Sequence, residues 1–219
     1  MDIETSPDPR WAAEGEKAFD ANGKLKFPPL PYHIPEVIVW LCTENSTGEL
    51  TLNSYDLAET DERLVLELLA TDIRSSQRMV SWNGRTFDMP LLNLRAMLKR
   101  VDWSFWIEKR FRFENYKRKL YHYDMIEQLG NYGSARSLSL DRVGMLLGLQ
   151  GKNIMHGDEV ADTLKTDRKK VVRYCVSDVC QTFLVYLLFC GTHLGAGEKA
   201  FQQFDKIKGA LIEKGYLKE

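Results

Sequence analysis

The sequence has few cysteines, and their arrangement argues against a zinc or disulfide protein. Its four cysteines, Cys42, Cys175, Cys180 and Cys190, form no CxxC pair and have no partnered histidines at zinc spacing. Three of them lie in or near one apolar stretch, where buried, reduced thiols are the usual arrangement. We therefore expect structural thiols, with a soft-metal or redox site as the alternative.

The sequence also shows no long apolar run, no signal-peptide pattern at residues 1–5 and no excess of one charge. Apolar runs such as 185–189 are far too short to cross a bilayer, and residues 1–5 show no basic segment followed by an apolar core. Lys plus Arg number 30 against 31 Asp plus Glu, a net charge of −1. We expect a cytoplasmic protein with no membrane contact, whose affinity for nucleic acid would come from local basic clusters.

The sequence does contain the pattern of an α/β protein in its 219 residues. Residues 6–35 are typical of a long loop, and apolar runs predict strands over 36–43, 49–55, 78–83 and 120–125, the first two forming a hairpin. Helical spacing predicts helices over about 60–75, 87–101, 137–149, 166–190 and 198–214, the first imperfectly capped by Thr60 and the fourth capped by Thr166 or Asp167. We assign 1–190 to one domain and 191–219 to a C-terminal helical extension packed on it.

The first candidate site residues are Asp2 and Glu4, which are two positions apart in an apparent strand. Because side chains alternate along a strand, both carboxylates project to one side. Two adjacent like charges are costly unless a cation lies between them, and oxygen ligands of this kind suit Mg²⁺ or Mn²⁺. The alternative is a pair of solvated acids near the chain end.

Two later segments add further acids. Asp88 follows a strand that ends near Asn83, a position where α/β folds place ligand sites, although it also fits a first-turn helix acid. Tyr174 and Asp178 are four apart in a long apolar helix and share one face. Their alternative interpretation is a surface pair.

Together, Asp2-Ile-Glu-Thr5, the segment from Asn83 to Phe87-Asp88, and the segment from Tyr174 to Asp178 resemble the three motifs of the DEDD superfamily of 3′–5′ exonucleases. The similarity is to the proofreading domain of family-B DNA polymerases and its stand-alone relatives, which residues 120–133 and 148–152 also resemble. It covers roughly residues 1–190. Position 173, where the histidine branch has His, is Arg, so the sequence resembles the tyrosine branch.

The resemblance implies an RNase H-like fold, a mixed sheet flanked by helices, for the exonuclease domain of 1–190. It implies two bound Mg²⁺ or Mn²⁺ ions, about 4 Å apart, that hydrolyse the 3′-terminal phosphodiester and release nucleoside 5′-monophosphates. Asp2, Glu4 and Asp178 would bind the metal that activates the water, Asp2 would bridge to the second metal, and Asp88 would assist through water. Tyr174 would orient the attacking water. The histidines at 33, 122, 156 and 193 are expected to be structural.

Substrate contacts are expected in the motifs and in one basic cluster. Residues 109–119 hold six basic side chains interleaved with three aromatic rings, a composition that suits a single-strand groove but also a solvated surface loop. The residues that we assign to nucleic-acid binding are Thr5, Asn83, Phe87, Arg112, Lys117, Arg118, Lys119 and Lys152.

Single-stranded DNA is the favoured substrate, in repair or proofreading beside replication or repair proteins. An RNA exonuclease and a non-catalytic nucleic-acid-binding module are the alternatives. Only Met1 precedes Asp2, where the family has several apolar residues before its first Asp. We expect weak metal affinity and low activity for the chain as given, and a rise in both when about four to six apolar residues are added upstream.

Overall fold

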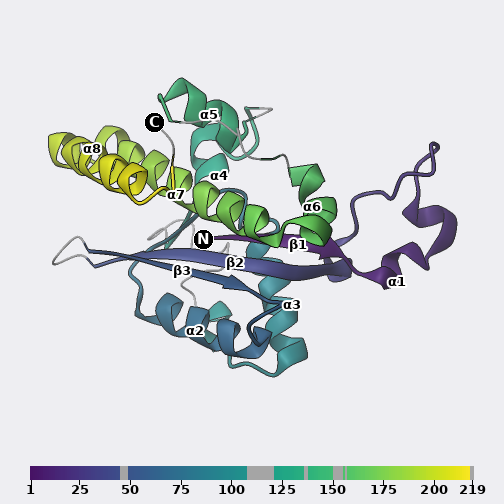
Figure 1. The fold of residues 1–219 in the computed structure, drawn as a ribbon. Helices are drawn as coiled ribbons and strands as arrows, with labels where there is room; N and C mark the ends of the chain where they lie inside the picture. Colours follow the sequence, from purple (N-terminus) through teal and green to yellow (C-terminus); the bar gives the residue numbers. More distant parts are fainter. Residues whose placement is uncertain (45–48, 108–120, 136–137, 150–154, 156, 218–219) are drawn as a thin grey trace.

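The computed structural model describes residues 1–44, 49–107, 121–135, 138–149, 155 and 157–217, which form a mixed α/β fold (Figure 1). The strands are β1 (Asp2–Pro7), β2 (His33–Thr43), β3 (Leu50–Asp56), β4 (Met79–Ser81) and β5 (His122–Asp124). The α-helices are α1 (Pro9–Ala12), α2 (Glu62–Ser75), α3 (Asp88–Lys99), α4 (Met125–Gly130), α5 (Leu140–Leu146), α6 (Val160–Thr166), α7 (Arg168–His193) and α8 (Gly197–Glu213).

The strands of the described residues form two sheets. β1, β2 and β3 make an antiparallel sheet, which confirms the predicted hairpin, and β4 pairs with β5 in parallel. The single mixed sheet that an RNase H-like fold implies is therefore not formed as one continuous ladder. The amino group of Met1 donates to the Val80 carbonyl at 2.9 Å, and residues of both β2 and β4 line a cavity of about 800 Å³.

In an RNase H-like fold β1 is expected in the interior of a sheet, but among the described residues its ladder runs with β2 alone. β4 has three residues, and each of them pairs with a residue of β5. The register between β1 and β2 shifts between Glu4 and Thr5. Whether an upstream extension of β1 raises metal affinity stays a prediction.

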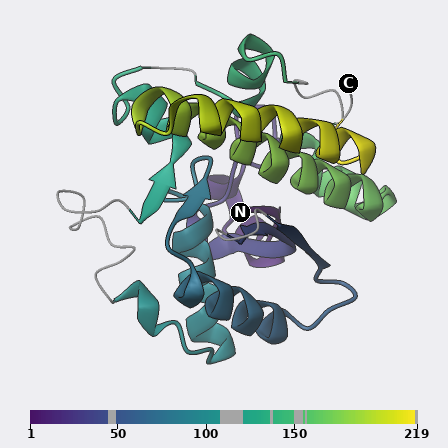
Figure 2. The same cartoon turned by 90° about the vertical axis from the view of Figure 1, so that its left-hand side faces the viewer.

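β2 divides the apolar core because its side chains alternate between two faces. Val37 and Val39 pack into the cluster built on α7, whereas Ile38 and Trp40 pack into the cluster built on α2 and α3. Figures 1 and 2 show this arrangement: α7 and α8 lie on one side of the three-stranded sheet, and α2 and α3 lie on the other. The face of β1 that opposes Ile3 is thereby turned towards α7.

Local capping sets the ends of two helices that border the site. Asp61, not Thr60, caps α2 by accepting a hydrogen bond from the Leu64 N–H at 3.1 Å, so the expected cap was wrong by one residue. Asp167 caps α7 as predicted, accepting from the Lys170 N–H at 3.0 Å. A side-chain oxygen at this position satisfies an N–H that the helix itself leaves unpaired.

α7 is the central helix of the larger core. Its 26 residues include a stretch long and apolar enough to span a bilayer, which the shorter runs in the sequence did not indicate, but most of that stretch is buried inside the protein. α8 packs along it, and a Cβ on Gly191 would lie 2.4 Å from the Phe201 ring, so glycine is needed for this close approach. The domain boundary at residue 190 stays a prediction.

Candidate active site

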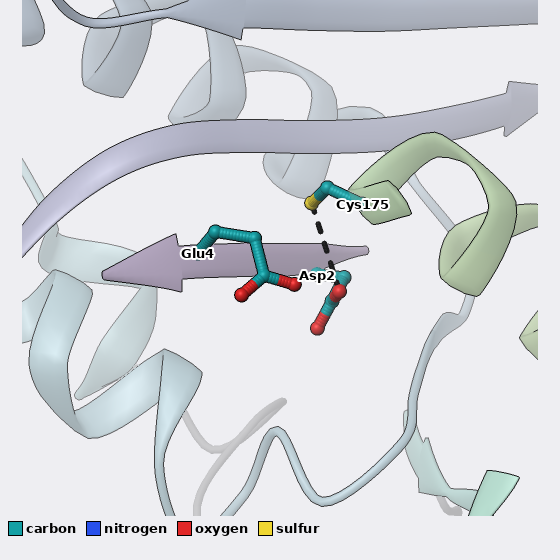
Figure 3. A group of neighbouring side chains, drawn as sticks. All are labelled: Asp2, Glu4 and Cys175. Atoms are coloured by element: carbon teal, nitrogen blue, oxygen red, sulfur yellow. Dashed lines mark hydrogen bonds between the residues drawn. The ribbon is translucent and has the colours of Figure 1, made fainter. Parts of the chain in front are cut away.

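Asp2 and Glu4 lie on β1 with their carboxylates on the same side of the strand, as alternation predicts (Figure 3). Glu4 is buried and Asp2 is half-buried. The strand holds them against α7, whose residues contact β1 and β2. The two acids are therefore not a solvated pair near the chain end.

α7 brings a cysteine to this pair. The Cys175 thiol donates to a carboxylate oxygen of Asp2 at 3.6 Å, and one ligand atom from each of Asp2, Glu4 and Cys175 lies within 4.8 Å of the others (Figure 3). Sequence reasoning placed Cys175 in the core and missed this contact. Its spacing of three from Asp178 on one helix was the available signal.

The chemistry of these donors suits a hard cation. Burial raises the pKa of the Cys175 thiol well above its usual value, and the nearby charges of Asp2 and Glu4 raise it further. In the metal-free protein the thiol is therefore protonated, whereas a cysteine that binds a metal is a thiolate. The carboxylate oxygens remain as ligands, and these suit Mg²⁺ or Mn²⁺.

Tyr174 and Asp178 are both buried on α7, so the surface-pair alternative is wrong. Burial raises the pKa of Tyr174 far above its usual value, and the negative charges of Asp178, Glu4 and Asp2 act in the same direction. The two motifs thus share one electrostatic environment. A phenol that stays protonated acts as a hydrogen-bond donor, and Asp178 accepts from it.

Asp88 is the first residue of α3 and is only 4% exposed, so its role is more than that of an exposed first-turn acid. Burial raises its pKa to about 7, although the Met1 amino group and a hydrogen bond to the Ile3 backbone lower it. The Oδ1 atom has no hydrogen-bond partner within the described residues. A buried carboxylate oxygen without a partner is costly, and a cation is a suitable partner for it.

The turn that leads to Asp88 is held by a residue that sequence reasoning did not single out. Asp124 at the end of β5 accepts from the backbone N–H groups of Asn83 at 2.7 Å and Arg85 at 2.9 Å. Asn83 has a φ of 65°, and its side-chain oxygen accepts from the Thr86 hydroxyl at 2.6 Å. The Asn83 side chain is exposed, so it remains accessible to a bound strand.

The remaining predicted contacts divide into two groups. Thr5 bonds to a ring nitrogen of His33 at 2.9 Å, and the ring of Phe87 lies 4.8 Å from that of His33. Both therefore lie beside the acid-bearing segments. Five predicted contacts lie outside the described residues and stay predictions: Arg112, Lys117, Arg118, Lys119 and Lys152.

Residues 25–217 match the model of a family described as predicted 3′–5′ exonucleases related to the exonuclease domain of PolB. The match includes Asp88, Tyr174 and Asp178 and begins after Asp2 and Glu4. No curated protein and no solved structure matches the chain. Since the match spans most of the sequence and agrees with the resemblance in the motifs, the chain belongs to this family of predicted 3′–5′ exonucleases.

Proposed function

We propose that this protein is a metal-dependent exonuclease that removes nucleoside 5′-monophosphates from the 3′ end of single-stranded DNA. The observation that supports the proposal is the pair of carboxylates on β1, Asp2 and Glu4, which have ligand atoms within 4.8 Å of each other and lie against α7. Asp2 and Glu4 on β1 share an environment with Asp178 on α7, and Asp88 on α3 contacts the backbone of β1. An RNase H-like arrangement, with helices on both sides of the sheet that bears the acids, is part of the proposal.

The four carboxylates would hold two Mg²⁺ or Mn²⁺ ions, with Asp2, Glu4 and Asp178 as one group. Bound divalent cations lower the pKa of a water towards neutrality and stabilise the charge on the leaving 3′ oxygen. The protein holds Asp88 in a buried position, where its Oδ1 atom has no hydrogen-bond partner among the described residues. Cys175 would be a neutral neighbour, because burial raises the pKa of its thiol.

Tyr174 would orient the attacking water and would not remove its proton. Its raised pKa keeps the phenol protonated, and because its one hydrogen is donated to Asp178, its oxygen would accept a hydrogen bond from the water without taking the proton. Asp178, which accepts from that phenol, fixes its direction. The chain therefore positions the water with a residue whose charge does not change during the reaction.

Single-stranded DNA is proposed over RNA because the family is related to a DNA polymerase's exonuclease domain. The same relation supports a place in DNA repair or proofreading, beside replication or repair proteins. The sequence contains all five residues, Asp2, Glu4, Asp88, Tyr174 and Asp178, and this supports an enzyme over a non-catalytic binding module.

The test is Asp178→Ala, assayed as release of mononucleotides from 3′-labelled single strands of DNA and of RNA in Mg²⁺ and in Mn²⁺. We expect turnover to fall by more than about 10²-fold, since the loss of even an outer-shell partner of a metal costs about 10–100-fold. Asp205→Ala is the control, an exposed acid on α8 that should leave turnover unchanged. Undiminished turnover in folded Asp178→Ala protein would refute the site. Faster degradation of RNA than of DNA would show that RNA is the substrate.

A further inference from the structure

Three aromatic rings form a cluster at the carboxyl end of β1 that the metal chemistry does not use. The ring centroids of Phe27 and His33 are 4.6 Å apart, those of His33 and Phe87 are 4.8 Å apart, and those of Phe27 and Phe87 are 5.8 Å apart. Rings at these separations attract one another. The sequence motifs include Phe87, but Phe27 and His33 come from the segment that precedes β2 and from its first residue.

The His33 ring is locked in one orientation at the base of this cluster. Its Nε2 atom lies 3.0 Å from the Pro28 carbonyl, and because a carbonyl only accepts, Nε2 carries the hydrogen. In the neutral ring Nδ1 is therefore the acceptor, and it takes a hydrogen bond from the Thr5 hydroxyl at 2.9 Å. His33 is 3% exposed, so it lies on the buried side of the cluster.

Phe27 lies on the outside of the cluster and is 77% exposed, more than any other aromatic side chain that the structure describes. Its backbone is nevertheless held on both sides. The Lys26 N–H donates to the Ala18 carbonyl at 2.8 Å, the Lys26 carbonyl accepts from the Trp11 ring at 3.1 Å, and the Pro28 carbonyl accepts from His33. A ring fixed in this way loses little conformational freedom when a flat ligand stacks on it.

The position of the cluster indicates which ligand would stack. Thr5, which bonds to His33, directly follows Glu4, and Phe87 directly precedes Asp88. The rings are therefore attached to both of these acid-bearing segments. A neutral nucleobase meets no repulsion there, whereas the phosphates need the cations. Single exposed apolar residues are common on protein surfaces, but this ring is one of a fixed group of three.

We propose that Phe27, supported by His33 and Phe87, stacks against one of the two bases at the 3′ end of the bound strand. The inference rests on the proposed function, because the metal site fixes where the 3′ end lies. Stacking of a base on an aromatic ring strengthens single-strand binding by roughly 5-fold to 150-fold. His33 and Thr5 are positioning residues in this account, and Phe27 makes the contact.

The test compares Phe27→Ala, Phe27→Leu and Phe27→Trp with wild type in their affinity for a short DNA strand, in Ca²⁺ and in EDTA. Matched strands carry an abasic residue at the terminal or the penultimate 3′ position. Phe27→Ala and Phe27→Leu should weaken binding of the intact strand by roughly 5-fold to 150-fold, and Phe27→Trp should retain it. Leu146→Ala, which removes a similarly exposed apolar side chain on α5, is the control and should bind as wild type does.

The decisive result is the coupling between the ring and the base. Removing the base at one of the two positions should weaken wild-type binding but leave the affinity of Phe27→Ala unchanged. If Phe27→Ala loses affinity equally for intact and abasic strands, or loses none, the stacking site is wrong. Wild type that shows the coupling but degrades no DNA would refute the proposed activity alone, whereas degradation without coupling would refute only the stacking site.

Discussion

Asp88 and Asp124 are two buried aspartates that differ in what they bind; Asp88 begins the helix after β4, and Asp124 ends β5, its parallel neighbour. Asp124 is fully buried, and it accepts hydrogen bonds from the backbone of Asn83, Arg85 and Ile126. Asp88 is 4% exposed, and its Oδ1 has no partner within the described residues. Asp88 also accepts a hydrogen bond from the Ile3 backbone and is affected by the charge of the Met1 amino group, so it lies beside β1.

Burial alone therefore does not identify a metal ligand in this fold. Burial raises the pKa of both carboxyls, but three backbone hydrogen bonds oppose the rise at Asp124. At Asp88 the pKa reaches about 7. A carboxylate whose hydrogen bonds are complete holds the backbone, and one that lacks a partner suits a cation.

The largest expected effect is the difference in turnover between variants of Asp88 and Asp124. Asp88→Asn should fold normally and lose more than about 10²-fold in turnover with Mg²⁺, because a buried carboxylate near the metal is removed. Asp124→Asn should mainly lose stability, by about 1–3 kcal/mol, since its amide nitrogen cannot accept a hydrogen bond from a backbone N–H group. Parallel assays of turnover and urea unfolding would check this. Equal losses of stability in both variants would show that the two aspartates do not differ in role.

A smaller effect, on stability, is expected from a substitution at Gly84, in the turn that Asp124 holds before Asp88. A Cβ on Gly84 would lie 2.5 Å from the Ser81 Oγ and 2.6 Å from its Cβ, so rotation of the hydroxyl cannot relieve the clash. Gly84→Ala should cost about 1–3 kcal/mol in the free energy of unfolding, as overpacking typically does. Gly157→Ala is the matched control, because its Cβ would meet nothing within 4 Å. If Gly84→Ala and Gly157→Ala were equally stable in chemical denaturation, the turn would be able to move enough to accept the added Cβ.

The smallest expected effect is the pH dependence of metal-free stability. Asp88 has a pKa of about 7 when folded, against 3.8 for the model group, so between these values the folded protein binds more protons. Stability from this group is therefore lost as pH rises towards 7. Unfolding midpoints of wild type and Asp88→Asn in EDTA should diverge over this range. Parallel curves would contradict the assignment.

The sequence predicted those parts of the site that follow from local rules. Strand alternation placed Asp2 and Glu4 on one side, and helical spacing placed Tyr174 with Asp178. The contacts of Cys175 with Asp2 and of Asp124 with Asn83 join residues far apart in the chain, and local patterns do not specify such contacts. The division into two sheets depends on which strand edges meet, and neither composition nor periodicity shows that.

The account's central claim is that the carboxylates of β1, α3 and α7 hold divalent cations, and crystals grown with Mn²⁺ test it most directly. Anomalous difference density should show Mn²⁺ bound by oxygens of Asp2 and Asp178, with the Cys175 sulfur outside the coordination shell and Asp88 on the same side. Mn²⁺ bound through the Cys175 sulfur, or found only away from these carboxylates, would contradict the claim.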